Sequence, residues 1–459
     1  MTRIHLIGIG GTGLSAIARV LLEMGHTVSG SDRVESPFTR DLEAAGVTIY
    51  IGHRSENIRN ADIVVRSSAI PGDNPEVTAA RAFGIPVLKR ADFLGSLMEG
   101  KTGIAIAGTH GKTTTTAMIA WMLTALGQAP TFIVGGVIAN LGVNARAGKG
   151  ETFVIEADEY DRMFLGLRPA IEVVTNVEHD HPDCYPTPAD FQAAFREFVI
   201  RLTPGGTLVA CAEDAGARQL LTDAAQMNKT VLPYGIGSEA GDVPVHATVL
   251  SPNAKGGYTF TAGVLGSPVT VELQAPGKHN VRNALAALAV ARLLGLDLDA
   301  AAKALGDYQG TGRRFEVRGE ANGVTVIDDY AHHPTEIRAT LSAARTRYPS
   351  RRIWAVWQPH TYSRTQTLFT EFAAAFQDAD EVIVTEVYAA REPKQAFSSQ
   401  QVVDAMQHPS AHFIAELNEV SKHLVSHLRP GDVLLVLSAG DADQVSAEAL
   451  TRLKEVRNG

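Results

Sequence analysis

The chain has 459 residues, of which 45% are hydrophobic and 20% are charged, with a formal net charge of -9 at pH 7. This length exceeds what one hydrophobic core usually organises, so it predicts several domains. The composition leaves no room for a large disordered region. The acidic balance argues against a protein that follows a nucleic-acid backbone through a broad basic surface, so we expect no nucleic-acid partner.

Cysteine usage and apolar runs indicate the compartment. Cys184 and Cys211 occur in neither disulfide-framework nor metal-ligand spacing, which is typical of reduced residues. Residues 1–10 turn into glycines before a signal-peptide apolar region develops, and no apolar run approaches about 18 residues. We therefore expect a cytoplasmic protein without membrane insertion.

Three segments each open with an apolar strand and then alternate strands with helical patterns. They span residues 1–98, 99–315 and 316–459. Such alternation predicts parallel α/β sheets. We expect an α/β protein of three domains, with an N-terminal Rossmann-like domain, a central P-loop ATPase-like parallel sheet and a C-terminal Rossmann-like domain. The boundaries near 98 and 315 are candidate hinges.

The first glycine loop, GIGGTG at residues 8–13, follows a strand and opens a helix, and Asp32 ends the next strand. Glycines let the backbone approach a diphosphate at a helix N-terminus, while the carboxylate can bind a ribose. This fingerprint is typical of dinucleotide-binding proteins, so an NAD-dependent oxidoreductase is one interpretation. Any nucleotide diphosphate satisfies the same chemistry.

The second glycine loop, GTHGKTT at residues 108–114, follows the buried strand run 103–108. Its Lys112 and Thr113 are the pair that contacts β/γ-phosphates and magnesium in a Walker-type loop. The loop departs from the strict pattern because Ile106 stands six residues before the lysine. The flanking strand and helix favour a phosphate loop over a plain glycine turn.

Six segments in this order resemble the Mur ligase family over the whole chain. They are GTHGKT at 108–113, IEADEYD at 155–161, TNVEHDHPD at 175–183, GKHNVRNAL at 277–285, DDYAHHP at 328–334 and QPHTYSRT at 358–365. The last is similar to the signature of the family branch that adds L-alanine. The resemblance implies ATP-dependent ligation of L-alanine to the carboxylate of UDP-N-acetylmuramate through an acyl phosphate, in peptidoglycan precursor synthesis.

The resemblance also implies three binding sites and a metal site. For ATP it implies Gly108, Thr109, His110, Gly111, Lys112, Thr113, Thr114, Asn283, Arg314 and Asp329. For the UDP sugar it implies Gly10, Gly11, Gly13, Asp32, His53, Ser67 and Ser68, and for the amino acid Tyr330, His360 and Arg364. Mg²⁺, or Mn²⁺ in its place, would be held by Thr113, Glu156 and His181. Lys112, Arg314 and His332 are the expected catalytic residues.

Two departures from the family pattern affect these expectations. Thr361 stands where the alanine-adding signature has an arginine, so Arg364 has to hold more of the incoming carboxylate. Residues 187–203 contain no lysine, so a second metal would be held without the carbamoylated lysine of several relatives. The carboxylates of Glu159, Asp161, Glu178 and Asp180 fit either the site or a solvated loop.

Two other functions remain open at this stage. A recycling ligase that adds a murein tripeptide to the same sugar suits segment 156–161, although segment 358–365 argues against it. An NAD-dependent oxidoreductase, or a nucleotide sensor without catalysis, would leave most of the six segments unexplained. We expect a monomer or a weak homodimer.

Overall fold

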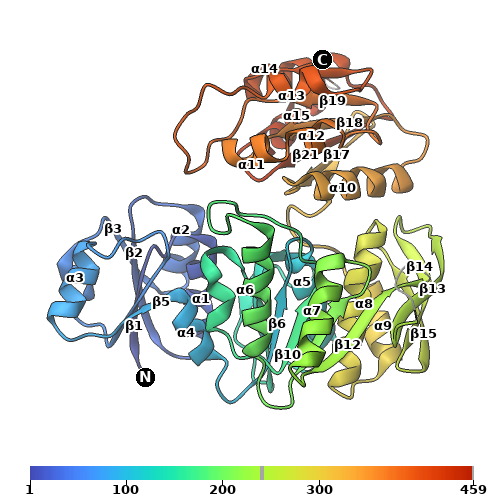
Figure 1. Cartoon of the computed structure of the whole chain (residues 1–459). Helices are drawn as coiled ribbons and strands as arrows, with labels where there is room; N and C mark the ends of the chain where they lie inside the picture. The colour runs from blue at the N-terminus through green and yellow to red at the C-terminus, as the bar shows by residue number, and fades with distance from the viewer. Residues whose placement is uncertain (238–241, 457–459) are drawn as a thin grey trace.

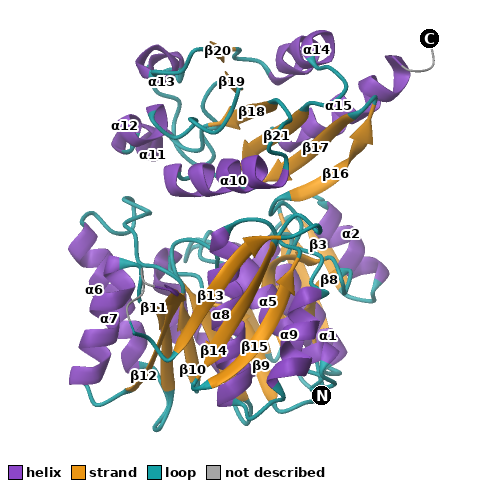
Figure 2. Ribbon diagram, turned by 90° about the vertical axis from the view of Figure 1, so that its right-hand side faces the viewer, coloured by secondary structure: helices purple, strands orange, loops and turns teal. Residues whose placement is uncertain are grey.

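The computed structural model describes residues 1–237 and 242–456, which form three α/β bodies (Figure 1). The chain runs from the N-terminal body through the middle body to the third, which lies above the middle one in Figures 1 and 2. Each body contains one sheet. The expectation of a three-domain α/β protein is confirmed. No helix within the described ranges has the length and apolar character needed to span a bilayer.

The N-terminal body is a parallel sheet in the order β3-β2-β1-β4-β5. Its elements are β1 Arg3–Ile7, α1 Thr12–Glu23, β2 Thr27–Asp32, α2 Pro37–Ala44, β3 Thr48–Ile51, η1 Ser55–Ile58, β4 Ile63–Arg66, α3 Pro75–Ala82, β5 Val87–Lys89 and α4 Arg90–Leu97. The strand order reverses beside β1. In sheets of this kind ligands bind outside the carboxyl ends of the strands at that reversal, which is where the first glycine loop lies.

The middle body has a ten-stranded sheet in the order β15-β14-β13-β12-β11-β10-β6-β9-β7-β8. Its elements are β6 Thr102–Ala107, α5 Lys112–Ala125, β7 Thr131–Ile138, β8 Val143–Arg146, β9 Thr152–Glu156, η2 Tyr160–Gly166, β10 Ile171–Val174, α6 Pro188–Ile200, β11 Thr207–Cys211, α7 Ala215–Gln226, β12 Thr230–Ile236, β13 Val245–Pro252, β14 Tyr258–Val264, β15 Ser267–Leu273, α8 Lys278–Leu293 and α9 Leu298–Gly306. The strands from β13 to β7 are parallel as expected. Short hairpin connections add antiparallel β14, β15 and β8 at the two ends.

The third body has the sheet order β16-β17-β21-β18-β19-β20, parallel except for the edge strand β16. Its elements are β16 Glu316–Ala321, β17 Val324–Asp329, α10 Pro334–Arg347, β18 Ile353–Gln358, α11 Tyr362–Thr367, α12 Phe369–Ala373, β19 Glu381–Val384, α13 Gln400–Ala405, β20 Ala411–Phe413, α14 Leu417–His427, β21 Val433–Ser438 and α15 Asp443–Val456. Helix α10 lies along the side of this body that faces the middle body (Figures 1 and 2).

The first two bodies share one hydrophobic core, whereas the third has cores of its own. Phe93 of α4 and Met98, which follows this helix, belong to the same buried cluster as Phe153 and Phe164 of the middle body. The clusters around β17, β18 and β21 contain third-body residues only. The crossing from the middle body to the third, at residues 310–316, includes positive φ angles at Gly310, Arg313 and Phe315. This segment is therefore a better hinge candidate than the packed boundary near residue 98.

Candidate active site

The phosphate loop joins β6 to α5 at the carboxyl edge of the middle sheet. Gly111 caps α5 with a φ of 82°, a left-handed conformation that favours glycine. A Cβ there would lie 3.1 Å from Oδ1 of Asn283, and one on Gly108 would lie 2.1 Å from Oγ1 of Thr175. Both glycines therefore have close neighbours that leave little room for a Cβ, and Asn283, predicted to bind ATP, lies against Gly111 of the loop.

Lys112 folds its ammonium group back against this loop. Its Nζ donates to the carbonyl oxygens of Gly108 at 2.6 Å and Thr109 at 3.2 Å, and lies 2.8 Å from Oε1 of Glu159. Burial opposes the charge, but Glu159 and the neighbouring carboxylates outweigh it and raise the lysine pKa. Glu159 is only 1% exposed, and its Oε2 has no hydrogen-bond partner among the residues that the structure describes. A permanent positive charge therefore lies where a terminal phosphate would meet the loop.

Oxygen donors suited to a hard cation surround the start of α5. The hydroxyl of Thr113 donates to Oε1 of Glu156 at 2.9 Å, and the amide of Gly135 donates to Oε2 at 2.7 Å. Burial raises the pKa of Glu156. His181 lies with its Nε2 3.5 Å from Oε1 of Glu159 instead. The hydroxyl and carboxylates fit a divalent cation such as Mg²⁺, and the unpartnered Glu159 oxygen joins the predicted donors.

His110 of the phosphate loop lies between two carboxylates from different bodies. Its Nε2 is 3.0 Å from Glu178, and its Nδ1 is 3.2 Å from Glu336 of α10. Burial opposes protonation, but these two partners outweigh it and raise the pKa of His110 to about 9. His110, Glu178 and His333 also offer metal-type ligand atoms within 4.8 Å of one another. Each ring nitrogen of His110 faces a carboxylate oxygen, an arrangement that favours the doubly protonated ring.

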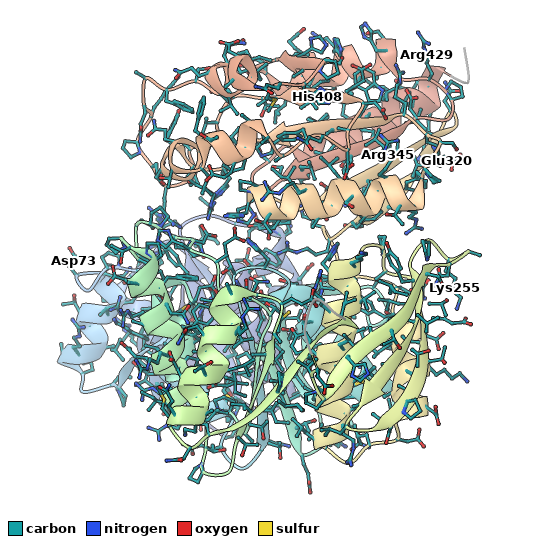
Figure 3. The ribbon with its side chains drawn as sticks, turned by 45° about the vertical axis from the view of Figure 1, so that its right-hand side comes forward. Asp73, Lys255, Glu320, Arg345, His408 and Arg429 are labelled. Carbon is teal, nitrogen blue, oxygen red and sulfur yellow. The ribbon has the colours of Figure 1, made fainter. Side chains whose placement is uncertain are left out.

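A cavity of about 960 Å³ opens between the middle and third bodies. Six predicted ATP residues line it, namely His110, Gly111, Thr114, Asn283, Arg314 and Asp329. Gly108, Thr109, Lys112 and Thr113 lie beside the cavity without lining it. Residues the sequence did not single out complete the wall, among them Tyr234, Lys255 and Arg347; Lys255 is labelled at the upper end of the β13–β14 hairpin in Figure 3. The volume suits a nucleotide.

Asp329 supports the hinge end of this cavity. Its Oδ2 accepts from the amide of Phe315 at 2.7 Å, and its Oδ1 accepts from the amide of Ala331 at 2.8 Å. Burial raises its pKa to about 6. The guanidinium of Arg314 lies 5.0 Å from the ring centre of Tyr330, so both residues border the junction of the two bodies.

Two histidines of the third body lie close together, namely His360 of the predicted amino-acid site and the predicted catalytic residue His332. The Nδ1 of His332 lies 2.9 Å from the carbonyl oxygen of Tyr330, and burial lowers the pKa of His332 to about 3. The rings of His332 and His360 are 5.9 Å apart, and burial lowers the pKa of His360 to about 4. Both imidazoles are therefore neutral at pH 7. If Nδ1 of His332 donates to the carbonyl, its Nε2 presents a lone pair.

Arg364 is already engaged across the two bodies. Its Nε and Nη2 donate to Oδ1 of Asp180 at 3.1 and 3.0 Å, and its Nη1 lies 3.2 Å from Nδ1 of His360. Both side chains of the ion pair are less than a tenth exposed. Burial disfavours the Asp180 carboxylate, but Arg364 outweighs it and holds the pKa of Asp180 far below its usual range.

The predicted sugar-binding residues gather at the carboxyl ends of β1, β2 and β4. The amide of Gly10 donates to Oδ2 of Asp32 at 2.8 Å, and the amide of Ser67 donates to the carbonyl of Ile7 at 3.1 Å. Gly11 caps α1. Gly13 is covered by the guanidinium of Arg90, whose Nη1 lies 1.8 Å from where a Cβ would stand.

The remaining two members of this set lie at its edges. Nδ1 of His53 is 3.0 Å from Oγ of Ser31, which in turn donates to the buried carboxylate of Glu76. Ser68 lines a separate cavity of about 230 Å³ with Lys89, Arg162 and Arg201. Gly10 and Ser67 thus lie at the same sheet edge although they are 57 residues apart in sequence, whereas Ser68 faces the separate cavity.

Sequence reasoning missed Arg90 and Glu336, which the structure places beside predicted site residues, and it did not decide on Asp180. Arg90 covers Gly13 and lies 3.5 Å from Asp158, so it links the first glycine loop to the middle body, but no motif surrounds it. Asp180 was left undecided between site and loop. Glu336 does have a sequence signal, but it is a helix-capping signal. It is the third residue of α10 and forms a capping box with His333. That pattern predicts a helix start and does not reveal its contact with His110.

The fold and site together define a nucleotide-dependent enzyme built from three α/β bodies. Three family models match the chain: Mur ligase family, catalytic domain, at residues 3–102; Mur ligase middle domain, at 106–291; and Mur ligase, glutamate ligase domain, at 313–440. The chain belongs to the Mur ligase family. The resemblance found in the six segments is confirmed, and an NAD-dependent oxidoreductase is set aside.

Individual relatives cover nearly the whole chain. A Rubrobacter xylanophilus protein named UDP-N-acetylmuramate--L-alanine ligase is 46% identical over 458 residues, which are 98% of this chain and 100% of the relative. The solved structure of UDP-N-acetylmuramate-alanine ligase MurC from Thermotoga maritima has a TM-score of 0.82 at 29% identity, covering 99% and 100% of the two chains. A murein peptide ligase from Psychrobacter arcticus has a TM-score of 0.71 at 27% identity, covering 99% of each.

Proposed function

We propose that this protein is an ATP-dependent carbon–nitrogen ligase that joins L-alanine to the carboxylate of UDP-N-acetylmuramate, forming ADP and phosphate. The observation that carries the proposal is the set of relatives with this name, at 43 to 46% identity over nearly their full length. The segment 358–365 supports the same branch of the family. We further propose that the enzyme acts in the cytoplasm as a monomer or weak homodimer.

The carboxylate of the sugar must first be activated, because a carboxylate is a poor electrophile. Its oxygen attacks the γ-phosphorus of ATP, the bond to the β-phosphate oxygen breaks, and an acyl phosphate and ADP result. Lys112 would stabilise the charge that develops on the phosphoryl group, which is the main catalytic term in such transfers. Arg314, at the wall of the cavity, would add a second positive charge from the junction with the third body.

A divalent cation fits the donors found at the start of α5. Thr113 and Glu156 would hold Mg²⁺ or Mn²⁺, and His181 with Glu159 would hold a second ion without a carbamoylated lysine. Such ions reduce the repulsion between phosphate oxygens and an incoming carboxylate. Hydroxyl, carboxylate and imidazole groups supply all the donors in this assignment. It therefore needs no carbamoylated lysine, which residues 187–203 do not contain.

In the second step the amine of alanine attacks the acyl carbon, the bond to the phosphate oxygen breaks, and the amine loses a proton. His332 is the residue we propose beside the amine. Because its pKa is near 3, it is better suited to accept a hydrogen bond and orient the amine than to remove a proton fully. Tyr330, His360 and Arg364 would form the rest of the amino-acid site.

Phosphate release measured across a panel of amines tests this function. We expect release coupled to amide formation with UDP-N-acetylmuramate and L-alanine together, and little release when either is omitted. Glycine, L-serine and the tripeptide of murein recycling are the comparison amines. Preference for the tripeptide would replace the proposed activity by the recycling one.

A further inference from the structure

The loop that follows β10 forms a row of acidic contacts with the third body. Oε1 of Glu178 accepts from the hydroxyl of Thr335 at 3.0 Å, Asp180 pairs with Arg364 at 3.0 Å, and Asp183 pairs with Arg391 at 2.8 Å. These contacts hold the third body on the middle one, and only Glu178 among these three acidic residues also touches the phosphate loop, through its Oε2 at 3.0 Å from Nε2 of His110.

One carboxylate of the third body does reach the phosphate loop. Glu336 lies on the first turn of α10, the helix that faces the middle body (Figures 1 and 2). Its Oε1 is 3.2 Å from Nδ1 of His110 and 3.9 Å from Nη1 of Arg314. Its Oε2 accepts from the backbone amides of His332 and His333 at 3.0 and 3.3 Å. The two oxygens therefore make different contacts. Oε2 caps α10, and Oε1 faces His110 and Arg314 at the predicted ATP site.

The contact joins two charged and mostly buried groups. The side chain of His110 is 12% exposed and that of Glu336 is 11% exposed. His110 is followed directly by Gly111, which caps α5, so a force on its ring is transmitted to the turn that binds phosphate. Hydrogen bonds to charged groups in such surroundings are typically worth more than neutral ones. Separation of the bodies would break this contact and leave His110 with Glu178 alone.

We propose that Glu336 is a positioning residue that couples closure of the third body to the geometry of the phosphate loop, acting through the imidazolium of His110. In the closed form it fixes the ring above the turn at Gly111 and orients Arg314 along the same cavity wall. In the open form the loop loses this support. This inference rests on the proposed ATP-dependent function and adds a mechanism by which ATP is held productively only after closure.

A glutamine at position 336 separates the two roles of the side chain. Its single carbonyl oxygen can accept from the capping amides or from His110, but cannot serve both, and its charge is lost. Glutamine is a normal residue at this capping position, so α10 should remain intact. Glu336→Gln should therefore lower kcat/KM for ATP about tenfold while changing the melting temperature little.

The decisive experiment is a double-mutant cycle with Glu336→Gln, His110→Ala and the double variant. We expect each single variant to lose about tenfold in kcat/KM for ATP and the double variant to lose little more than the worse single one. If the double variant instead lost the product of the two single losses, the two residues would act independently and the coupling would be refuted. Glu320→Gln, which removes an exposed carboxylate from β16 (labelled in Figure 3), is the charge-matched control and should behave as wild type.

The pH profile adds a readout that a merely structural role would not change. Glu178 and His333 also face His110, while His332 and Arg314 face Glu336. Removal of one carboxylate partner lowers the affinity of His110 for its proton, so activity of Glu336→Gln should decline at lower alkaline pH than that of wild type. An identical profile in a folded variant would contradict the proposal. UDP-sugar binding should be unchanged throughout.

Binding of a non-hydrolysable ATP analogue separates this inference from the proposed function. If the wild-type enzyme forms no amide with L-alanine, the proposed function is wrong, yet the cycle can still be measured on analogue affinity. We expect the same non-additivity there. Additive binding losses together with normal ligase activity would leave the function intact and refute the role of Glu336.

Discussion

At the scale of single residues, the structure gives Arg364 two competing roles. The sequence predicted that it binds the alanine carboxylate without the second guanidinium of the alanine-adding signature, because position 361 is threonine. The structure pairs Arg364 with Asp180 through two nitrogens, with both groups buried. One nitrogen, Nη1, faces His360 instead. The alanine carboxylate would therefore have to approach this nitrogen or share the guanidinium with Asp180.

The variant Arg364→Lys tests whether Arg364 binds the alanine carboxylate. A lysine offers a point charge on a flexible stem and cannot present two parallel donors, so the KM for alanine should rise at least about tenfold. The KM values for ATP and the UDP sugar should change by no more than about twofold. Steady-state kinetics with each substrate varied in turn would measure these changes.

Asp180→Asn is the matched control for this variant. It keeps a hydrogen-bond acceptor but removes the charge that occupies Arg364. If Arg364 mainly holds the two bodies together, both variants should raise the KM values of all three substrates by similar factors. An unchanged KM for alanine in a folded Arg364→Lys protein would refute the binding role.

At the scale of an element, helix α5 has a left-handed glycine at each end. Gly111 has a φ of 82° at the N-cap, and Gly127 has a φ of 74° just after the C-terminus. An alanine at either position adds backbone strain of about 1 to 2 kcal/mol. Asn283 lies 3.1 Å from the position of a Cβ on Gly111, whereas at Gly127 no described residue beyond its two chain neighbours comes within 4 Å of that position.

Gly111→Ala and Gly127→Ala should therefore cost similar backbone strain but have different effects on nucleotide binding. Both should lower the free energy of unfolding by about 1 to 2 kcal/mol, measured by denaturant titration. Only Gly111→Ala should weaken binding of an ATP analogue, by about tenfold or more, because it displaces Asn283 and the loop. Equal analogue affinity in the two variants would show that the turn at Gly111 is not part of the nucleotide site.

At the scale of the whole molecule, buried histidines at the junction of the bodies make stability depend on pH in two directions. His332, His333 and His360 have pKa values lowered, chiefly by burial, to about 3, 4 and 4. Unfolding exposes them to their ordinary pKa near 6.5, so the unfolded chain binds more protons below that pH. His110 has the opposite shift, to about 9, so the folded chain binds the extra proton between pH 6.5 and 9.

The contribution of these histidines to the free energy of unfolding should consequently be greatest near pH 6.5. It should fall as the pH drops from 6.5 toward 4.5, and fall again as the pH rises from 6.5 through 9. The alkaline loss from His110 is on the order of 3 kcal/mol at most. Denaturant titrations at pH 5, 6.5 and 8.5 would measure both limbs. In His110→Ala the alkaline limb should flatten while the acidic limb persists; an unchanged alkaline limb would contradict the assignment.

The sequence alone determined the family, the three α/β segments and most residues of the phosphate loop. These features are local, because a glycine loop between a strand and a helix is encoded within about ten neighbouring residues. Motifs of known chemistry also assigned Gly10 and Asp32 to one predicted site, that of the UDP sugar. They assigned Gly111 and Asn283 to another, that of ATP. The sequence did not distinguish Glu159 and Asp180 from solvated surface carboxylates, since burial is a property of the folded chain.

Tertiary structure decided which charges meet. His110 faces Glu336, Arg364 faces Asp180, and Arg90 covers Gly13, at separations of 226, 184 and 77 residues along the chain. No periodicity or motif encodes such pairs, because they depend on how the packed bodies are placed against one another. The same placement makes His332 neutral and His110 charged, since one is desolvated without a dominant partner and the other lies between two carboxylates. Sequence thus specified the chemical groups, and the packing of the bodies set their charge states and partners.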